Sequence, residues 1–316
     1  MPNALSDALC ARFLSDLAEA TEGRADARFG LCVSGGPDSL ALMLLAVSSG
    51  LDCEAATVDH GLRPEALAEA RTVADVANSL GIQHQILTIT APVSGNVSAW
   101  ARSERYRALL AWAEAQQRDF LLTAHHADDQ LETMIMRLNR GSGVAGLAGV
   151  RAQRDGLARP LLGWRKAELE ALVLAAGLEP CDDPSNRDDR FDRARLRKAL
   201  AGADWLDPLA ANRSARALAE AEAALVWAAT AYEGRRVAAR DGVISFAHSG
   251  LPQELKRRIT LACLRRVNDL ADPRGEELDR LMQGLAAGRV AALAGVKCTG
   301  GEFWLFSLAP PRRFTP

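Results

Sequence analysis

The stretch Arg28-Phe-Gly-Leu-Cys-Val-Ser-Gly-Gly-Pro-Asp-Ser-Leu-Ala-Leu-Met-Leu-Leu-Ala-Val47 decides the fold. Residues 28–33 form a short apolar run that predicts a buried strand, and residues 40–47 have the composition of a helix. Between them lies Ser34-Gly-Gly-Pro-Asp-Ser39, in which two glycines permit a sharp turn and Pro37 suits a first helical turn. The stretch therefore predicts a strand, a tight loop and a helix.

Strand and helix patterns alternate as far as Asn139. The sequence predicts strands at 54–58, 84–89 and 120–123, and helices at 64–80, 98–117 and 128–139. This alternation predicts an α/β fold, a doubly wound and mostly parallel sheet with helices on both faces. Ligands of such sheets bind beyond the carboxyl ends of the strands. The polar stretches expected there are 34–39, 59–63 and 123–129.

The alternation stops near residues 203–207, and a long Ala-rich helical pattern runs from Pro208 to Ala239. Further helices are expected at 166–176, 190–200, 252–268 and 276–284, and strand-like segments at 243–246, 290–293 and 302–308. We therefore predict a catalytic domain over residues 1–204 and a smaller, mainly helical C-terminal domain over residues 205–316. An α+β organisation of the second domain stays open.

The composition is that of a globular chain: 316 residues are 48% hydrophobic and 25% charged, with a formal net charge of −2. The first hundred residues are acidic and the remainder is mildly basic, which hints at an anion-binding surface in the rear two-thirds. No apolar run is long enough to span a membrane, and the N-terminus lacks the basic start of a secretory signal, so we expect a cytoplasmic protein with no membrane partner.

The six cysteines are scattered, and no two are spaced as a Cys-x-x-Cys pair. This spacing disfavours zinc ribbons, iron–sulfur ligation and a disulfide framework, and it predicts free, buried thiols.

The loop Ser34–Ser39 has the chemistry of a polyphosphate site. Gly35 and Gly36 let the backbone approach an anion closely, the serines supply hydroxyl groups, and the N–H groups of a helix start point to the same place. The loop lacks the lysine of a Walker A motif. Asp38 would repel a bare phosphate, so its presence suggests a bridging Mg²⁺ ion.

These residues resemble a known family. Ser34-Gly-Gly-Pro-Asp-Ser39 resembles the PP-loop of the N-type ATP pyrophosphatases, and further blocks resemble, in order, the motifs of tRNA(Ile)-lysidine synthases. Those blocks are Val58-Asp-His-Gly-Leu-Arg63, Ala101–Tyr106, Ala124-His-His-Ala-Asp-Asp-Gln-Leu-Glu-Thr133, Gly141–Gly149, Arg159-Pro-Leu-Leu162, and Asp183–Asn186 with Phe191–Arg193. The likeness covers residues 28–200 in detail. One departure is Ala194, where the family pattern has Asn.

The resemblance implies an ATP- and Mg²⁺-dependent ligase that acts on tRNA. Such an enzyme adenylates the wobble cytidine of the isoleucine tRNA with a CAU anticodon, releasing pyrophosphate. It then joins free L-lysine to the 2-position of the base, forming lysidine and releasing AMP. The product tRNA changes from methionine to isoleucine specificity. The C-terminal domain would bind tRNA, and a homodimer is one option for the oligomeric state.

The resemblance also assigns site residues. It implies catalytic roles for Asp38, Arg105, His125, Asp129 and Glu132, with Asp38 as the metal ligand. ATP would be bound by Ser34, Gly35, Gly36, Pro37, Asp38, Ser39, Val58 and Asp59. Arg193 and Arg197 lie four residues apart on one helix face and would contact tRNA or phosphate.

Several of these residues have simpler interpretations. Asp128 is expected at the amino end of a helix, where a carboxylate favourably complements the helix dipole, and this explains the residue equally well. A packed or hydrogen-bonded position in the core explains His126 equally well, and support of a turn explains His60. Asp129 and Glu132 share a helix face and would hold either the ammonium of lysine or a magnesium ion.

Three other functions can be weighed against this one. A PP-loop tRNA thiolase would use the same adenylation with a sulfur donor, and the lack of a Cys-x-x-Cys pair disfavours members that use paired cysteines. A sensor that binds ATP without turnover would not need Asp129 and Glu132. An amidotransferase-type synthetase is disfavoured because the chain has no N-terminal Cys.

Overall fold

The computed structural model describes residues 5–24, 26–63, 65–181 and 192–310. The chain divides into two compact units, Met1–Ala219 and Glu220–Pro316, and the division falls within helix α9 (Pro208–Arg236). The boundary proposed from the sequence, between residues 204 and 205, stays a prediction. The motif residues Asp183–Asn186, Arg190 and Phe191 lie outside the described residues.

The first unit contains a six-stranded sheet of order β3-β2-β1-β4-β6-β5. Its strands are β1 (Phe29–Cys32), β2 (Cys53–Asp59), β3 (His84–Thr88), β4 (Phe120–Leu122), β5 (Gln153–Arg154) and β6 (Leu157–Ala158). All neighbouring pairs are parallel except β5 with β6, at the edge. The predicted mostly parallel sheet is confirmed.

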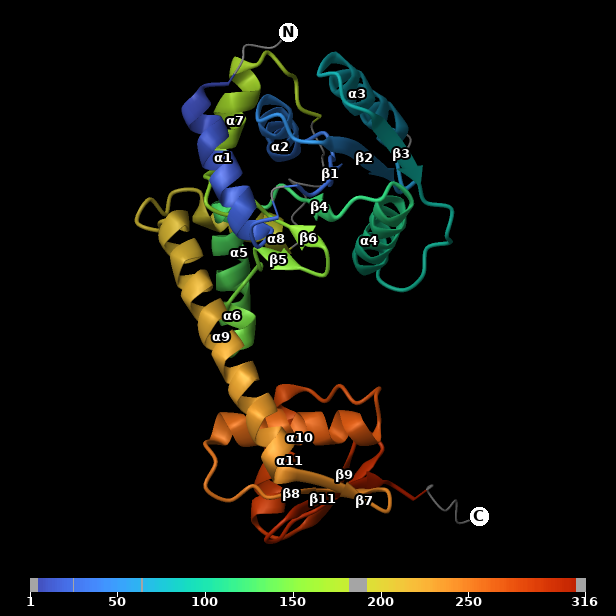
Figure 1. The fold of residues 1–316 in the computed structure, drawn as a ribbon, viewed down its shortest axis with the longest axis vertical. Helices are drawn as coiled ribbons and strands as arrows, with labels where there is room; N and C mark the ends of the chain where they lie inside the picture. The colour runs from blue at the N-terminus through green and yellow to red at the C-terminus, as the bar shows by residue number, and fades with distance from the viewer. Residues whose placement is uncertain (1–4, 25, 64, 182–191, 311–316) are drawn as a thin grey trace. The chain divides into compact units, whose positions relative to one another are not determined.

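Helices cover both faces of this sheet. Leu31 and Ala55 face a core built with α1 (Asp7–Ala20), α2 (Pro37–Ser48), α3 (Ala66–Ser79) and α7 (Lys166–Ala175). Ala56 and Leu121 face a second core with α4 (Val97–Ala115). Figure 1 shows α2 and α3 on one side of β2 and α4 on the other. The alternation of buried residues along β1 and β2 therefore makes the sheet doubly wound.

The strand order places a binding crevice beside β1. From β1 the chain crosses through α2 to β2 on one side, and later places β4 on the other side. Connections that leave neighbouring strands in opposite directions open a crevice at their carboxyl ends. The loop that follows β1 and the segment that follows β4 therefore meet there. That segment leads into α5 (Ala127–Leu138), and the short helix α6 (Val144–Leu147) and α8 (Asp192–Leu200) complete the unit.

The second unit packs helices on an antiparallel sheet of order β7-β8-β11-β10-β9. Its strands are β7 (Val237–Arg240), β8 (Val243–Phe246), β9 (Val290–Leu293), β10 (Val296–Thr299) and β11 (Trp304–Leu308). Phe246, Trp304 and Phe306 are buried in one core with residues of α10 (Gln253–Val267) and α11 (Gly275–Ala286). Of the two organisations left open by the sequence, the structure has α+β, with helices supplying more residues than strands.

The sequence pattern does not predict two strands of this sheet, β7 and β10. The helical pattern was extended to Ala239, but α9 ends at Arg236 and residues 237–240 form β7. Asp241 and Gly242 both have positive φ, 49° and 74°, which is the geometry of a tight two-residue hairpin turn between β7 and β8. Ala294 and Gly295 form the equivalent turn before β10.

Within the described part of the chain, no helix is both long and apolar enough for a membrane span.

Candidate active site

The loop Ser34–Ser39 presents a row of free backbone N–H groups. Gly36 caps α2, and Pro37 occupies its first turn. Ser39 Oγ accepts from the Ser34 N–H at 3.2 Å and donates to the Gly36 carbonyl at 2.9 Å, which fixes the turn from within. None of the described residues accepts a hydrogen bond from the N–H groups of residues 35, 36, 38 and 39. Four unused donors at a helix start make the expected anion cradle.

Asp38 stands at this cradle with an unused oxygen. Its Oδ1 is shielded from solvent and has no hydrogen-bond partner, while its Oδ2 lies 3.5 Å from His126 Nε2. A buried carboxylate oxygen without a donor is costly unless a cation occupies the space beside it. Mg²⁺ is usually held by one or two carboxylates together with substrate phosphates. Asp38 and the free N–H groups therefore fit a magnesium-bound polyphosphate.

His126 connects the loop to helix α5. Its Nδ1 accepts from the Asp129 N–H at 3.3 Å, and Asp129 Oδ2 accepts from the His126 N–H at 3.3 Å, so the two residues form a capping box. Because Nδ1 is an acceptor, the ring proton lies on Nε2, which faces Asp38 and Asp129 at 3.5 Å each. Burial lowers the pKa of His126, but the surrounding carboxylates outweigh it and leave the pKa raised. The expected packed or hydrogen-bonded core histidine is confirmed, and His126 also links the loop to α5 through Asp38 and Asp129.

Asp129 and Glu132 project from one face of α5 and meet two arginines from α8. Arg197 Nε lies 2.5 Å from Glu132 Oε1, and its Nη2 lies 3.3 Å from Asp129 Oδ1. Arg193 Nε lies 3.2 Å from Glu132 Oε2, and its Nη2 donates to Thr133 Oγ1 at 2.9 Å. The sequence placed these arginines against tRNA or phosphate; the structure pairs them with the two carboxylates.

The two carboxylates respond differently to this environment. Burial would raise the pKa of Asp129, but His126, His125 and Arg193 lower it below its ordinary value. Burial raises the pKa of Glu132 despite the opposing effect of Arg197. Glu132 Oε2 is also shielded from solvent; Arg193 Nε forms an ion pair with it at 3.2 Å, but it accepts no hydrogen bond from the described residues. An unsatisfied acceptor beside an ionised carboxylate suits an additional ammonium group.

His125 lies between this pair and a group of arginines. Its Nδ1 is 3.0 Å from Thr123 Oγ1. Burial lowers the pKa of His125 to about 4, with Arg159, Arg102 and Arg193 contributing and Asp129 opposing. His125 is therefore neutral at neutral pH. As a neutral ring it can donate one hydrogen bond to a phosphate, but it is poorly suited to the role of a charged general acid.

The remaining predicted residues lie along neighbouring strand ends. Val58 and Asp59 end β2, beside β1, and Asp59 Oδ1 accepts from the Gly61 N–H at 2.8 Å. Asp59 therefore supports the turn that the sequence assigned to His60, whose ring instead lies 6.5 Å from that of Trp100. Arg105 projects from α4, with its guanidinium 5.3 Å from the Tyr106 ring.

Asp128 is separate from the carboxylate pair. Its Oδ2 accepts from the Lys166 N–H at 2.8 Å and lies 3.4 Å from Arg165 Nε, so it joins α5 to the start of α7. This structural role fits the interpretation of Asp128 as a helix-end residue.

All six cysteines are free, and Cys53, Cys263 and Cys298 are buried. Among the described residues, no group of three or more His, Cys, Asp or Glu side chains forms a metal cluster.

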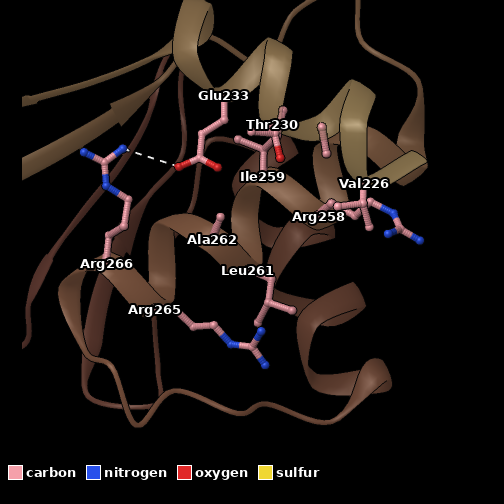
Figure 2. Close-up of a pocket in the computed structure, with 10 residues that line it drawn as sticks. Val226, Thr230, Glu233, Arg258, Ile259, Leu261, Ala262, Arg265 and Arg266 are labelled. Atoms are coloured by element: carbon pink, nitrogen blue, oxygen red, sulfur yellow. Dashed lines mark hydrogen bonds and ion pairs between the residues drawn. The ribbon is translucent and has the colours of Figure 1, made fainter. Parts of the chain in front are cut away.

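A cavity of about 470 Å³ lies in the second unit, between α9 and α10. Figure 2 shows its lining, including the ion pair between Arg266 and Glu233, whose charged atoms are 3.4 Å apart. Arg258 donates two hydrogen bonds to Glu222, and Arg265 pairs with Asp272. Because these charges are already paired, and no predicted site residue lines the cavity, we assign it no chemistry.

The fold and the free loop define a PP-loop nucleotide-binding protein, and a family model described as a PP-loop domain matches residues 9–203. The fold is similar to that of a U34-tRNA thiolase from Methanococcus maripaludis, solved with its [4Fe-4S] cluster. The TM-score is 0.54 at 16% sequence identity, and the likeness covers 68% of this chain and 81% of that chain. This similarity shows the fold only.

Curated relatives define the family more closely. The chain is 46% identical over 299 residues to the tRNA(Ile)-lysidine synthase of Novosphingobium aromaticivorans, and 39% identical over 295 residues to that of Zymomonas mobilis. Each comparison covers 90% of this chain and 90% of the relative. The chain belongs to the tRNA(Ile)-lysidine synthase family of PP-loop enzymes.

Proposed function

We propose that this protein joins free L-lysine to the 2-position of the wobble cytidine in the isoleucine tRNA with a CAU anticodon, using ATP. One observation carries the proposal. Two buried carboxylate oxygens, Asp38 Oδ1 and Glu132 Oε2, accept no hydrogen bond from the described residues, although Arg193 Nε forms an ion pair with Glu132 Oε2 at 3.2 Å. One adjoins a loop of free N–H groups, and the other adjoins the ionised Asp129. The first suits a metal-bound polyphosphate and the second suits an ammonium group.

The first step is adenylation of the base. The 2-carbonyl oxygen of cytidine attacks the α-phosphorus of ATP, the bond to the β-phosphate oxygen breaks, and pyrophosphate leaves. The free N–H groups of residues 35, 36, 38 and 39 lie where the leaving group gains charge, and they stabilise it without reorganising. Mg²⁺ bound at Asp38 would neutralise further phosphate charge. Val58 and Asp59, at the end of the neighbouring strand, border the space for adenine.

The second step replaces the activated oxygen with lysine. The amine of lysine attacks the 2-carbon of the ring, and AMP leaves with the former carbonyl oxygen. Asp129 and Glu132 hold the incoming ammonium and accept the proton that the amine loses before it attacks. Arg193 and Arg197 form ion pairs with these carboxylates. Lysine must therefore share or displace those pairings when it binds.

The second unit, together with the basic stretch Arg190–Lys198 of the helix expected at residues 190–200, is proposed to bind the body of the tRNA. We expect the protein to act in the cytoplasm, where its tRNA substrate occurs. A homodimer is retained as a proposal for the oligomeric state. The relatives support the choice of reaction over thiolation, because their names specify lysidine synthesis and the alignment covers 90% of both chains.

The test uses the purified full chain, ATP, Mg²⁺ and radiolabelled lysine with three transcripts. We expect label on the isoleucine transcript with the CAU anticodon. We expect none on the same transcript with a GAU anticodon, and none on the methionine tRNA that shares CAU. Unlabelled RNA at saturating ATP would refute the proposed reaction, and label on the methionine tRNA would refute its specificity.

A further inference from the structure

Arg159 is a buried cation that forms no ion pair with the described residues. It directly follows β6, and only 8% of its surface is exposed. Its Nη1 donates to the Arg151 carbonyl oxygen at 2.8 Å, but its Nε is shielded from solvent and has no hydrogen-bond partner. None of the described carboxylates lies within ion-pair distance of it. A buried charge in this state is unfavourable unless an anion completes it.

A second arginine faces the same place from α4. Arg102 holds its guanidinium 5.1 Å from the Tyr106 ring, and Arg105 lies over the same ring at 5.3 Å. Neither has an ion-pair partner among the described residues. Arg107, on the next turn of this helix, is paired with Glu104. The helix therefore leaves unpaired the arginines that gather around Tyr106.

The ends of three neighbouring strands place Arg159 on the same edge of the sheet as His125. β1, β4 and β6 are adjacent and parallel, so Cys32, His125 and Arg159 follow one another along the same edge. The Thr123 N–H bonds to the Ala158 carbonyl at 3.0 Å and fixes the β4 and β6 ends in register. Arg159 forms a side-chain hydrogen bond with Tyr106, and the Arg102 guanidinium lies 5.1 Å from the ring of that tyrosine, so both arginines adjoin Tyr106. Burial lowers the pKa of Arg159, Tyr106 opposes this effect, and Arg102 lowers the pKa further. Both arginines also depress the pKa of His125.

We propose that Arg102 and Arg159 form a binding site for a backbone phosphate of the RNA substrate, next to the reacting base. The inference rests on the proposed function for the identity of the RNA. Paired guanidinium groups match phosphate oxygens in charge and geometry. An aromatic ring in the same cluster suits an unstacked anticodon base.

The position favours RNA over the phosphates of ATP. ATP phosphates have their own cradle in the Ser34–Ser39 loop, which leads into α2 on one face of the sheet. Arg102 comes from α4 on the opposite face, and Arg159 comes from β6, two strands away from β1 on the side opposite β2. The cluster is thus a second phosphate position. Its two arginines lower the pKa of His125, whereas Asp129 raises it. A phosphate there would hold the wobble nucleotide against the adenylation site.

The experiment measures tRNA affinity as a function of salt, without lysine or ATP. We compare the wild type with Arg159→Gln and Arg102→Gln, using Arg107→Gln as the matched control on α4. Loss of one phosphate contact to a single-stranded loop should reduce the slope of log affinity against log salt by about 0.7. We expect about 10-fold weaker binding at about 150 mM salt for the two cluster variants and an unchanged slope for the control.

ATP affinity separates the two sources of phosphate. Unchanged ATP affinity together with the lower slope supports the RNA site. A loss of ATP affinity with an unchanged slope would assign the arginines to the nucleotide, and an unchanged slope with unchanged ATP affinity would leave them structural; either result overturns the inference. Should Arg159→Gln fail to fold, the exposed Arg102 decides the question through its own slope. Because lysine is absent, failure here is distinct from failure of the proposed ligation.

Discussion

The phosphate loop and the carboxylate pair of this site hold charge in opposite ways. In Ser34–Ser39, the backbone N–H groups of residues 35, 36, 38 and 39 donate to none of the described residues and are already in place, with no basic side chain in the loop itself. Asp129 and Glu132 are instead joined to Arg193 and Arg197, which come from a helix more than sixty residues away in the chain. The loop is preorganised for its ligand, whereas the carboxylate pair is neutralised by its own protein.

The difference separates the two proposed steps. Adenylation relies on donors that need no rearrangement, which is the favourable case for electrostatic catalysis. Lysine binding must exchange one set of ion pairs for another, so its net free energy is smaller than its contacts suggest. The comparison predicts that variants of the loop affect ATP turnover strongly, while variants of the carboxylate pair affect chiefly the requirement for lysine.

The largest effect is expected for Asp38→Asn. Without this carboxylate the loop loses its proposed magnesium contact, and release of AMP should fall by about 10²–10³-fold. Steady-state AMP formation at saturating ATP, lysine and tRNA measures this. Asp119→Asn is the control, since Asp119 pairs with Arg24 away from the loop. Undiminished turnover of Asp38→Asn would remove Asp38 from the metal site.

His125 should make the folded protein sensitive to acid. Its folded pKa of about 4 lies below the unfolded value of about 6.5, so the unfolded chain binds the proton first as pH falls. The stability associated with a neutral His125 is complete above about pH 6.5 and is lost progressively towards pH 4, by at most about 3 kcal/mol. Urea unfolding at several pH values should show a shallower loss for His125→Asn than for the wild type. Parallel pH curves would contradict the assignment.

Glu132→Gln should chiefly raise the concentration of lysine that is needed. The amide keeps the shape but loses the charge, so we expect KM for lysine to rise by about 10-fold, with a smaller change in KM for ATP. Glu168→Gln provides the control, because Glu168 also pairs with an arginine, Arg12, outside the site. If the two Michaelis constants rise equally, Glu132 supports the site as a whole and does not bind lysine.

The two loop glycines should respond differently to alanine. Gly35 has φ of +86°, and an added Cβ would lie 3.0 Å from Cys181 Sγ and from Val73 Cγ2, so Gly35→Ala should cost about 1–2 kcal/mol of stability. Gly36 has φ of −71°, and its nearest neighbour would be Ser34 Oγ at 3.9 Å. Gly36→Ala should therefore keep its stability but weaken ATP binding. Equal melting temperatures for both variants would contradict this account of the turn.

Sequence alone was sufficient for the loop because all of its determinants are local. The glycines, Pro37 and Ser39 lie within six residues, and the alternating strand and helix patterns around them specify the parallel sheet. Asp241-Gly242 also carried a readable hairpin signal, which would have corrected the predicted end of α9. His126 could have been found as the residue three positions before Asp129, since that spacing permits a reciprocal cap.

The remainder depends on contacts that no local pattern encodes. The pairing of Arg197 with Glu132 joins residues 65 positions apart, and it appears only when α8 lies against α5. Arg159 has an ordinary place in a short apolar motif, and its unpartnered Nε becomes evident only from burial at the end of β6. Charge pairing and desolvation depend on tertiary structure, so a sequence can nominate charged residues without revealing their partners.

The most direct test of the two-part site is the ratio of products in one reaction. Labelled lysine joined to the CAU-anticodon isoleucine tRNA and AMP released should be measured together in the full-length protein with ATP and Mg²⁺. If the loop and the carboxylate pair serve successive steps of one ligation, one lysine is incorporated for each AMP. AMP formed at the same rate when lysine is omitted, or with no lysine in the RNA, would contradict the assignment of Asp129 and Glu132 to the nucleophile.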